Sequence, residues 1–304
     1  GNTQIYYQPT DTIQIDETYH YRPRSDAANL ELRYEDNSNR NYISNRFTMD
    51  GEINHGRSEE LRQTLRTSRL SAGNYFNLIR NRENSTWEFR SATQYAYQPA
   101  SLLLEEGKSK FNQHSFYTDN SAAYLRKYNG FTQQYKAGIQ GERATMKYIP
   151  PTQPNDFNAS NLSLYFNPYF QLQRGKGLAT LSLPLKAQRY FSQQRSFLFF
   201  NPSTYLRYKL DYHWTFSLYG SLKRSAGDFS DLYPGLYQTD YRTWRSGNGL
   251  FPTSTTQTYN LYGEYKNTVQ EFFVTASLTY SRSNRNTLFE QSVSENAIVY
   301  TQRE

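Results

Sequence analysis

Residues 162–172 read Leu162-Ser163-Leu164-Tyr165-Phe166-Asn167-Pro168-Tyr169-Phe170-Gln171-Leu172, and this stretch decides the fold. Its even-numbered positions are apolar, whereas its odd-numbered positions carry hydroxyl, amide or phenol groups. Because successive side chains of a β-strand point to opposite faces, this alternation predicts a strand with one apolar and one polar face. Such a strand is longer than the usual strand of a soluble sheet, which has about 5–6 residues.

The same period of two recurs along the chain. Apolar residues occupy alternate positions in the ranges 179–187, 214–222 and 272–280, and more weakly in 30–34, 87–97 and 259–265. Short turns are expected at 175–177, 211–213 and 266–268, and longer connections at 149–160, 193–196 and about 225–257. Short turns that alternate with longer loops are typical of a transmembrane β-barrel.

The fold class predicted from this pattern is all-β, an antiparallel up-and-down transmembrane β-barrel. At the observed spacing the chain supplies roughly 12–14 strands of a larger barrel. Residues 1–304 are expected to form one barrel segment, a single domain without a plug, whose last strand is 296–303. One stretch, 58–70, has leucines near helical spacing, so a short helix is an alternative there.

Composition narrows the function classes. The chain has 304 residues, no cysteine, four histidines and a formal net charge of +7, and its mean hydropathy is −0.90. A low mean hydropathy is compatible with a barrel, because only every second residue of a strand meets lipid. The basic residues are scattered and no nucleic-acid-binding motif accompanies them, so nucleic acid is not expected as a partner. A basic excess also suits a wall beside anionic lipid headgroups.

Enzymatic chemistry has no support in the sequence. The absence of cysteine excludes thiolate metal sites, no two histidines have helical metal-ligand spacing, and no nucleophile-elbow motif is present. We therefore expect a protein that is not an enzyme and that has no cofactor, no metal and no catalytic residue.

The connection at about 225–257 is rich in aromatic residues and contains two arginines. Aromatic faces stack on sugars or peptides, and arginine binds anionic groups through paired N–H donors. The alternative is that these side chains pack on one another or on the barrel rim, which keeps a long loop ordered. The residues that would contact a ligand in this extracellular-type loop are Tyr233, Tyr237, Tyr241, Arg242, Trp244 and Arg245.

Several fragments resemble TonB-dependent receptor-like outer-membrane proteins of the Bacteroidetes type. They are 201–208 (Asn-Pro-Ser-Thr-Tyr-Leu-Arg-Tyr), 214–216 (Trp-Thr-Phe), 231–235 (Asp-Leu-Tyr-Pro-Gly), 241–243 (Tyr-Arg-Thr) and 265–267 (Tyr-Lys-Asn). The resemblance covers about 197–285, and its fragments describe walls and loops rather than catalytic motifs.

The resemblance implies a 22-stranded barrel that is filled by an N-terminal plug and located in the outer membrane of a Gram-negative bacterium. The implied activity is nutrient uptake energised by the TonB complex, and a surface lipoprotein is a possible companion. No plug or TonB-interacting segment is recognised in these residues, so a longer parent chain is expected to supply the plug, the remaining strands and the contact with TonB. Two rival functions stay open: a soluble all-β ligand- or glycan-binding or adhesion module, and a barrel that acts only as a surface scaffold.

Overall fold

The computed structural model describes residues 2–7, 12–17, 21–58, 63–104, 107–149, 155–227, 232, 236–238, 243–247, 251–293 and 298–303. Within these ranges the chain forms β-strands and no α-helix. None of the described residues forms a helix with the length and apolarity needed to cross a membrane.

Most of the chain builds one large sheet. Its strands are β3 (Tyr21–Asn37), β4 (Asn41–Ser58), β5 (Gln63–Arg82), β6 (Ser85–Leu104), β7 (Gly107–Tyr128), β8 (Phe131–Ile149), β9 (Asn155–Arg174), β10 (Gly177–Ser182), β11 (Leu185–Tyr190), β12 (Arg195–Phe200), β13 (Ser203–Lys209), β14 (Trp214–Ala226), β17 (Thr253–Asn267) and β18 (Phe272–Arg285). All pairings in this sheet are antiparallel. β10 and β11 are the two parts of one interrupted strand, and β12 and β13 are the two parts of the next, so β10 pairs with β13 and β11 with β12.

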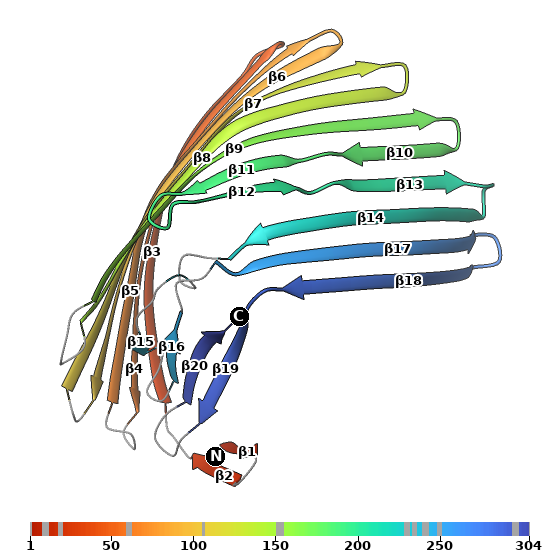
Figure 1. Ribbon diagram of the computed structural model, residues 1–304. Coiled ribbons are helices and arrows are strands. Elements are labelled where there is room, and N and C mark those ends of the chain that lie inside the picture. The colour runs from red at the N-terminus through yellow and green to blue at the C-terminus, as the bar shows by residue number, and fades with distance from the viewer. Residues whose placement is uncertain are drawn as a thin grey trace.

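The sheet is an open, curled trough with the order β3-β4-β5-β6-β7-β8-β9-β10-β13-β14-β17-β18 (Figure 1). Among the described residues β3 pairs only with β4, and β18 only with β17, so the sheet is not closed. The prediction of an all-β, antiparallel up-and-down partial barrel with roughly 12–14 strands is therefore confirmed.

Six short turns lie along one rim of the trough, at 38–40, 83–84, 129–130, 175–176, 210–213 and 268–271. Gly130 closes one of them with a positive φ of 75°, and a Cβ there would lie 2.2 Å from the carbonyl oxygen of Gln173. Asp211 closes another, because its Oδ1 accepts the backbone N–H groups of His213 and Trp214 at 2.8 and 2.7 Å. These hydrogen bonds lower the pKa of the Asp211 carboxyl, and the bond from Trp214 has the larger effect.

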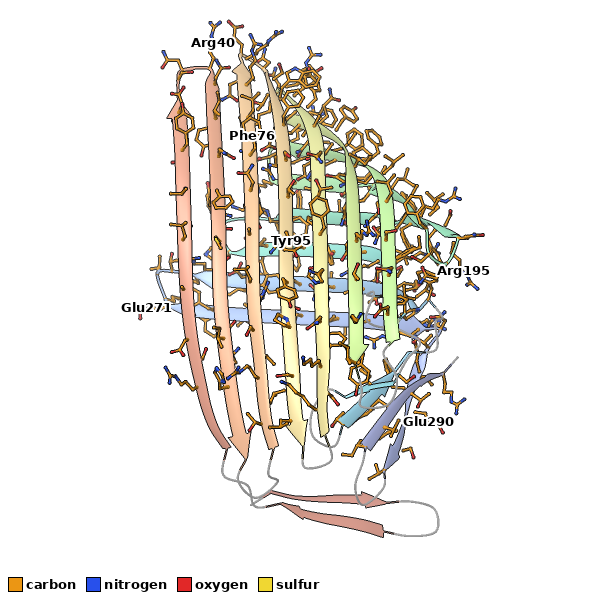
Figure 2. All side chains as sticks on the ribbon, turned by 90° about the vertical axis from the view of Figure 1, so that its left-hand side faces the viewer. Arg40, Phe76, Tyr95, Arg195, Glu271 and Glu290 are labelled. Carbon is orange, nitrogen blue, oxygen red and sulfur yellow. The ribbon has the colours of Figure 1, made fainter. Side chains whose placement is uncertain are left out.

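The convex face of the trough is apolar. Leu206, Leu218, Leu261 and Leu278 pair directly across β13, β14, β17 and β18, and their exposed fractions are 44, 42, 53 and 71 %. Figure 2 views the convex face of β3 to β9, on which Phe76 and Tyr95 lie, with Arg40 at the rim of short turns. A contiguous exposed apolar surface of this kind marks an interaction with lipid or with another protein.

Two smaller sheets accompany the trough. β1 (Asn2–Tyr7) and β2 (Thr12–Glu17) form a hairpin, while β15 (Leu236–Gln238), β16 (Thr243–Ser246), β19 (Leu288–Val293) and β20 (Ile298–Arg303) form a four-stranded sheet. The last strand predicted for the barrel, 296–303, thus corresponds to β20 in this small sheet, where it pairs in parallel with β16. The sequence of β20 alternates as a barrel strand does, so the sequence alone does not show whether β20 belongs to the trough or to the small sheet. Its pairing with β16 and β19 places it in the small sheet.

Other boundaries also differ from the sequence predictions. The helix considered at 58–70 is absent from its described residues, because β4 continues to Ser58 and β5 begins at Gln63. The connection expected at 149–160 is shorter, since β9 begins at Asn155, and that expected at 193–196 is a turn at 191–194. The turn expected at 266–268 lies at 268–271, because β17 and β18 continue their pairing to Asn267 and Phe272. In each case the ladder of backbone hydrogen bonds extends past polar residues that resemble a loop in sequence.

Candidate functional site

The concave face of the trough is polar. On β9, Asn161 and Ser163 are 6 and 0 % exposed and face the inside, whereas Leu164 is 58 % exposed on the convex side. The register carries this polarity across the neighbouring strands, because Ser163 lies opposite Gln140 of β8 and Gln188 of β11. The alternation of single residues along each strand therefore separates a lipid-type surface from a water-type surface.

A cavity of about 660 Å³ lies against this concave face and is lined by β5 to β9, β11, β12 and β14. Its size falls within the range of about 300–1,000 Å³ that is usual for small-molecule sites. The polar side chains of the lining include the amides of Gln94, Gln98, Gln113, Gln140, Gln188, Asn161 and Asn201, the hydroxyl groups of Ser115, Tyr117 and Ser225, the cations Arg69, Lys186 and Lys223, and the carboxylate of Glu142. Amides donate and accept hydrogen bonds, so the lining suits hydroxyl-bearing ligands, and its cations favour a negative charge.

Hydrogen bonds hold several of these groups in place. The Nζ of Lys186 donates to Oε1 of Gln140 at 3.1 Å, and Nδ2 of Asn161 donates to Oε2 of Glu142 at 3.2 Å. Both bonds connect side chains on neighbouring or nearby strands, so the rigid sheet fixes the spacing of these amide and charged groups.

An apolar cluster borders the cavity on the side of the rim opposite the short turns. Tyr190 of β11 and Phe197 of β12 contact Phe251, with ring centroids 4.4 and 5.3 Å apart. Leu232 is 1 % exposed and belongs to the same cluster. Both Leu232 and Phe251 come from the connection between β14 and β17, so part of that connection packs against the inner wall.

A seam interrupts the wall beside the cavity. Pro184 and Pro202 have no N–H group, and they separate β10 from β11 and β12 from β13. After Pro202, β13 pairs with both β10 and β14, whereas before it β12 pairs, among the described residues, with β11 alone. The side chain of Asn201 continues the ladder there, because its Oδ1 accepts the backbone N–H of Arg224 at 2.7 Å and its Nδ2 donates to the Arg224 carbonyl oxygen at 3.2 Å.

Of the six residues predicted to contact a ligand, Tyr237, Trp244 and Arg245 lie on β15 and β16 of the small sheet. Tyr233, Tyr241 and Arg242 are outside the described residues, and only the backbone is described for Tyr237 and Trp244. The pairing of β15 with β16 places Tyr237 opposite Arg245, and Arg245 lies over the ring of Phe289 at 4.8 Å from its centroid. The pairing thus brings Tyr237, Trp244 and Arg245 into one hairpin.

Sequence reasoning missed the cavity and the seam. The residues that line the cavity come from eight strands, and their positions depend on how these strands pair, so no local sequence motif predicts the cavity. A signal for the seam was present, because Pro184 interrupts an otherwise regular alternation. Within the described residues, no group of three or more histidine, aspartate or glutamate side chains could hold a metal ion.

The fold can be compared with solved structures. The copper transporter OprC superposes with a TM-score of 0.66 at 10 % identity, over 92 % of this chain and 48 % of that one. The outer membrane transporter YddB from Escherichia coli gives 0.61 at 8 % identity, with 96 % and 44 % of the two chains covered. The ferric yersiniabactin uptake receptor FyuA from Yersinia pestis gives 0.57 at 10 % identity, with 86 % and 45 % covered.

The chain has the fold of part of an outer-membrane receptor barrel. It spans about half the length of the solved structures that it matches. No protein-family model matches it, and no curated protein matches it. Because every identity is this low, the likeness concerns the fold, which agrees with the TonB-dependent receptor-like barrel that the sequence fragments resemble.

Proposed function

We propose that this receptor barrel segment forms part of the wall of a TonB-dependent transporter for nutrient uptake, in the outer membrane of a Gram-negative bacterium. The observation that carries the proposal is the separation of faces: an exposed apolar convex surface encloses a polar concave surface with a cavity of about 660 Å³. Lipid contacts the first surface and solute or protein contacts the second. Such a wall binds and guides its cargo without catalysing a reaction.

The open edges of the sheet support further protein partners. Unpaired N–H and C=O groups cost several kcal/mol each in lipid. The outer edges of β3 and β18 have no pairing partner among the described residues, so we propose that remaining strands of a parent chain complete the ring. A plug inside it, the TonB complex and a surface lipoprotein belong to the same proposal, which rests on the resemblance.

The ligand proposal for the connection between β14 and β17 remains part of this function. We propose that Tyr233, Tyr237, Tyr241, Arg242, Trp244 and Arg245 contact cargo at the rim opposite the short turns. Its support is that β15 and β16 bring three of them into one hairpin, while Leu232 and Phe251 anchor the same connection to the wall.

The rival function, a soluble all-β binding module, conflicts with the convex face. A soluble module would expose Leu164, Leu198 and Leu278, with exposed fractions of 58, 70 and 71 %, to water on the same surface. Soluble monomers rarely expose contiguous apolar patches larger than a few hundred Å², roughly. Lipid removes this conflict.

Growth of a deletion strain tests uptake by the full-length protein. The panel contains ferric siderophores, copper and glycans as limiting nutrients, and a strain without the TonB complex is grown in parallel. We expect slower growth on at least one nutrient, rescue by the intact gene, and the same defect without TonB. Normal growth on every nutrient, or a defect that TonB does not share, would contradict TonB-dependent uptake.

The loop is tested on the nutrient that this panel identifies. Alanine at Tyr241, Arg242 and Trp244 is expected to raise the concentration needed for half-maximal uptake while the protein remains in the outer membrane. A matched variant carries alanine at Tyr208, Lys209 and Tyr212, at the rim of short turns. Equal uptake by both variants and the unmodified protein would remove the loop from ligand binding.

A further inference from the structure

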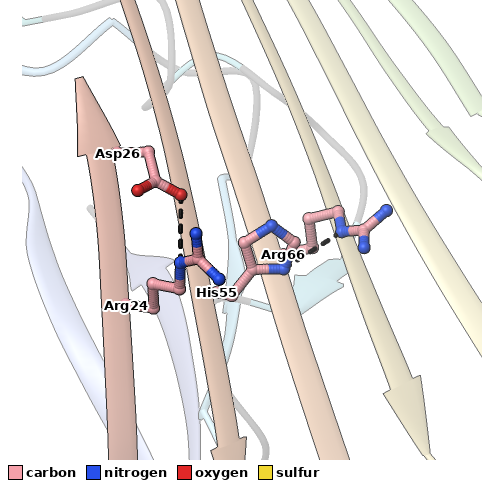
Figure 3. Close-up of polar contacts among 4 residues, drawn as sticks. All are labelled: Arg24, Asp26, His55 and Arg66. Carbon is pink, nitrogen blue, oxygen red and sulfur yellow. Dashed lines mark hydrogen bonds and ion pairs between the residues drawn. The ribbon is translucent and has the colours of Figure 1, made fainter.

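A row of four basic side chains and one serine crosses the convex face next to the apolar surface, on the side away from the short turns. Arg24 of β3 pairs with His55 of β4, His55 with Arg66 of β5, Arg66 with Ser101 of β6, and Ser101 with Lys110 of β7. Direct partners across antiparallel strands point to the same face of a sheet. The five residues therefore form one outward row, which we call the basic row, and Figure 3 shows three of them.

The basic row follows directly after the apolar surface on the side away from the short turns. His55 is one outward position beyond Ile53, which is 46 % exposed, and this step corresponds to about 7 Å along a strand. Arg66 is two outward positions beyond the exposed Leu70. In a bilayer the headgroup layer occupies about 5–7 Å outside each edge of the hydrocarbon core. The basic row consequently lies at headgroup level when the apolar surface contacts the acyl chains.

The chemistry of the row favours anions. Arg24 forms an ion pair with Asp26 at 3.1 Å, and this carboxylate is the one acid among the described outward positions of β3 to β7 at this level. Arg66 donates from its Nε to Nδ1 of His55 at 3.3 Å, and within the described residues its other N–H donors have no hydrogen-bond partner, so they can bind an incoming group (Figure 3). Lys110 is exposed at the other end of the row, and Lys108 adds a second ammonium group beside it.

We propose that the basic row binds phosphate groups carried by the headgroups of lipids in the outer leaflet. Arginine matches phosphate through paired N–H donors, and lysine adds a mobile point charge. The adjoining apolar surface holds the acyl chains of the same lipid molecule, so one lipid contacts both surfaces. The inference rests on the proposed membrane placement and adds a ligand that the concave wall does not address.

Lipid retention by the full-length protein tests the inference. The protein is reconstituted with a phosphorylated glycolipid or with the same glycolipid after removal of its phosphates, and bound lipid is counted by native mass spectrometry. The test variant carries Arg24→Gln, Arg66→Gln and Lys110→Gln. A matched variant loses the same charge on the concave face through Arg69→Gln, Lys186→Gln and Lys223→Gln.

Three lost cations near a membrane surface correspond to about a hundredfold weaker retention of the phosphorylated lipid. We expect this loss in the test variant alone, and little retention of the dephosphorylated lipid by any protein. Equal retention by the test variant and the unmodified protein, an equal loss in the concave-face variant, or displacement of the lipid by inorganic phosphate at equal concentration would overturn the inference.

Heat-modifiable migration of the same samples in gel electrophoresis distinguishes the proposed lipid binding by the basic row from the proposed placement in a membrane. A protein that inserts into the bilayer but retains lipid independently of the basic row contradicts only this inference. A protein that stays folded in plain buffer without detergent contradicts the membrane placement as well.

Discussion

Arginine at Leu218 is expected to destabilise the protein in a bilayer far more than arginine at its neighbour Ser217. Leu218 is the middle of the outward positions from Trp214 to Leu222 on β14, and leucines flank it on both neighbouring strands. Arginine on the lipid face near the midplane costs about 2–4 kcal/mol. Ser217 faces the polar concave side, where such a substitution changes stability by about 0.5 kcal/mol.

Equilibrium unfolding of the full-length protein in urea, from lipid vesicles, measures this difference. The unfolding midpoint of Leu218→Arg should fall at an unchanged slope, while that of Ser217→Arg should stay near the unmodified value. The assigned faces would be refuted if both variants lost equal stability or if Ser217→Arg lost more. A neutral Leu218→Arg would instead indicate that the convex face contacts water, as in the soluble-module alternative.

Three further outcomes follow from local geometry. Asn201→Ala should lower the free energy of unfolding, measured in urea, by about 1–3 kcal/mol. Asn201→Asp should lower it by less, because the bond accepted from the Arg224 N–H remains. Equal losses in the two variants would contradict a role for both amide atoms. Gly175→Ala should lower the free energy of unfolding by about 1–2 kcal/mol because of the positive φ at this position. Gly130→Ala should lower it more, because of these two glycines only Gly130 would bring a Cβ against a carbonyl oxygen. The reverse order in thermal unfolding would contradict the turn geometry. Because the pKa of Asp211 is lowered, its carboxylate stabilises the fold fully above the ordinary value of 3.8, and this stabilisation is lost as the pH falls below that value. Asp211→Asn should therefore flatten the acid side of a plot of unfolding free energy against pH. An unchanged plot would count against the two backbone bonds.

The strand pattern could be predicted from local sequence because it depends on single-residue steps. Leu162, Leu164 and Phe166 alternate with Ser163 and Tyr165, and a backbone with a period of two converts this order directly into two faces. The same reasoning supplied the class of fold and the approximate number of strands. It overestimated the length of the connection at 149–160 and placed the turn at 191–194 two residues too late, because polar residues at strand ends resemble loop residues when the pairing partner is unknown.

The candidate sites depend on information that no short window contains. Lys186 and Gln140 are far apart in the sequence and meet only because β8, β9 and β11 adopt one register. The basic row has the same origin, since Arg24, Arg66 and Lys110 look like scattered charges until the four pairings from β3 to β7 align them. Sequence reasoning singled out the loop aromatics instead, because residues that cluster along the chain are the ones a linear reading detects.

By itself the sequence determined that alternate side chains form an apolar and a polar face of each strand, because alternation along a strand is a property of neighbouring residues. Only the tertiary structure decided which strands are adjacent, where Asn201 bridges the seam, and that β20 joins a separate small sheet rather than the trough. The physical reason is that hydrogen bonds between strands connect residues distant along the chain, so register and partner choice are settled by the whole sheet.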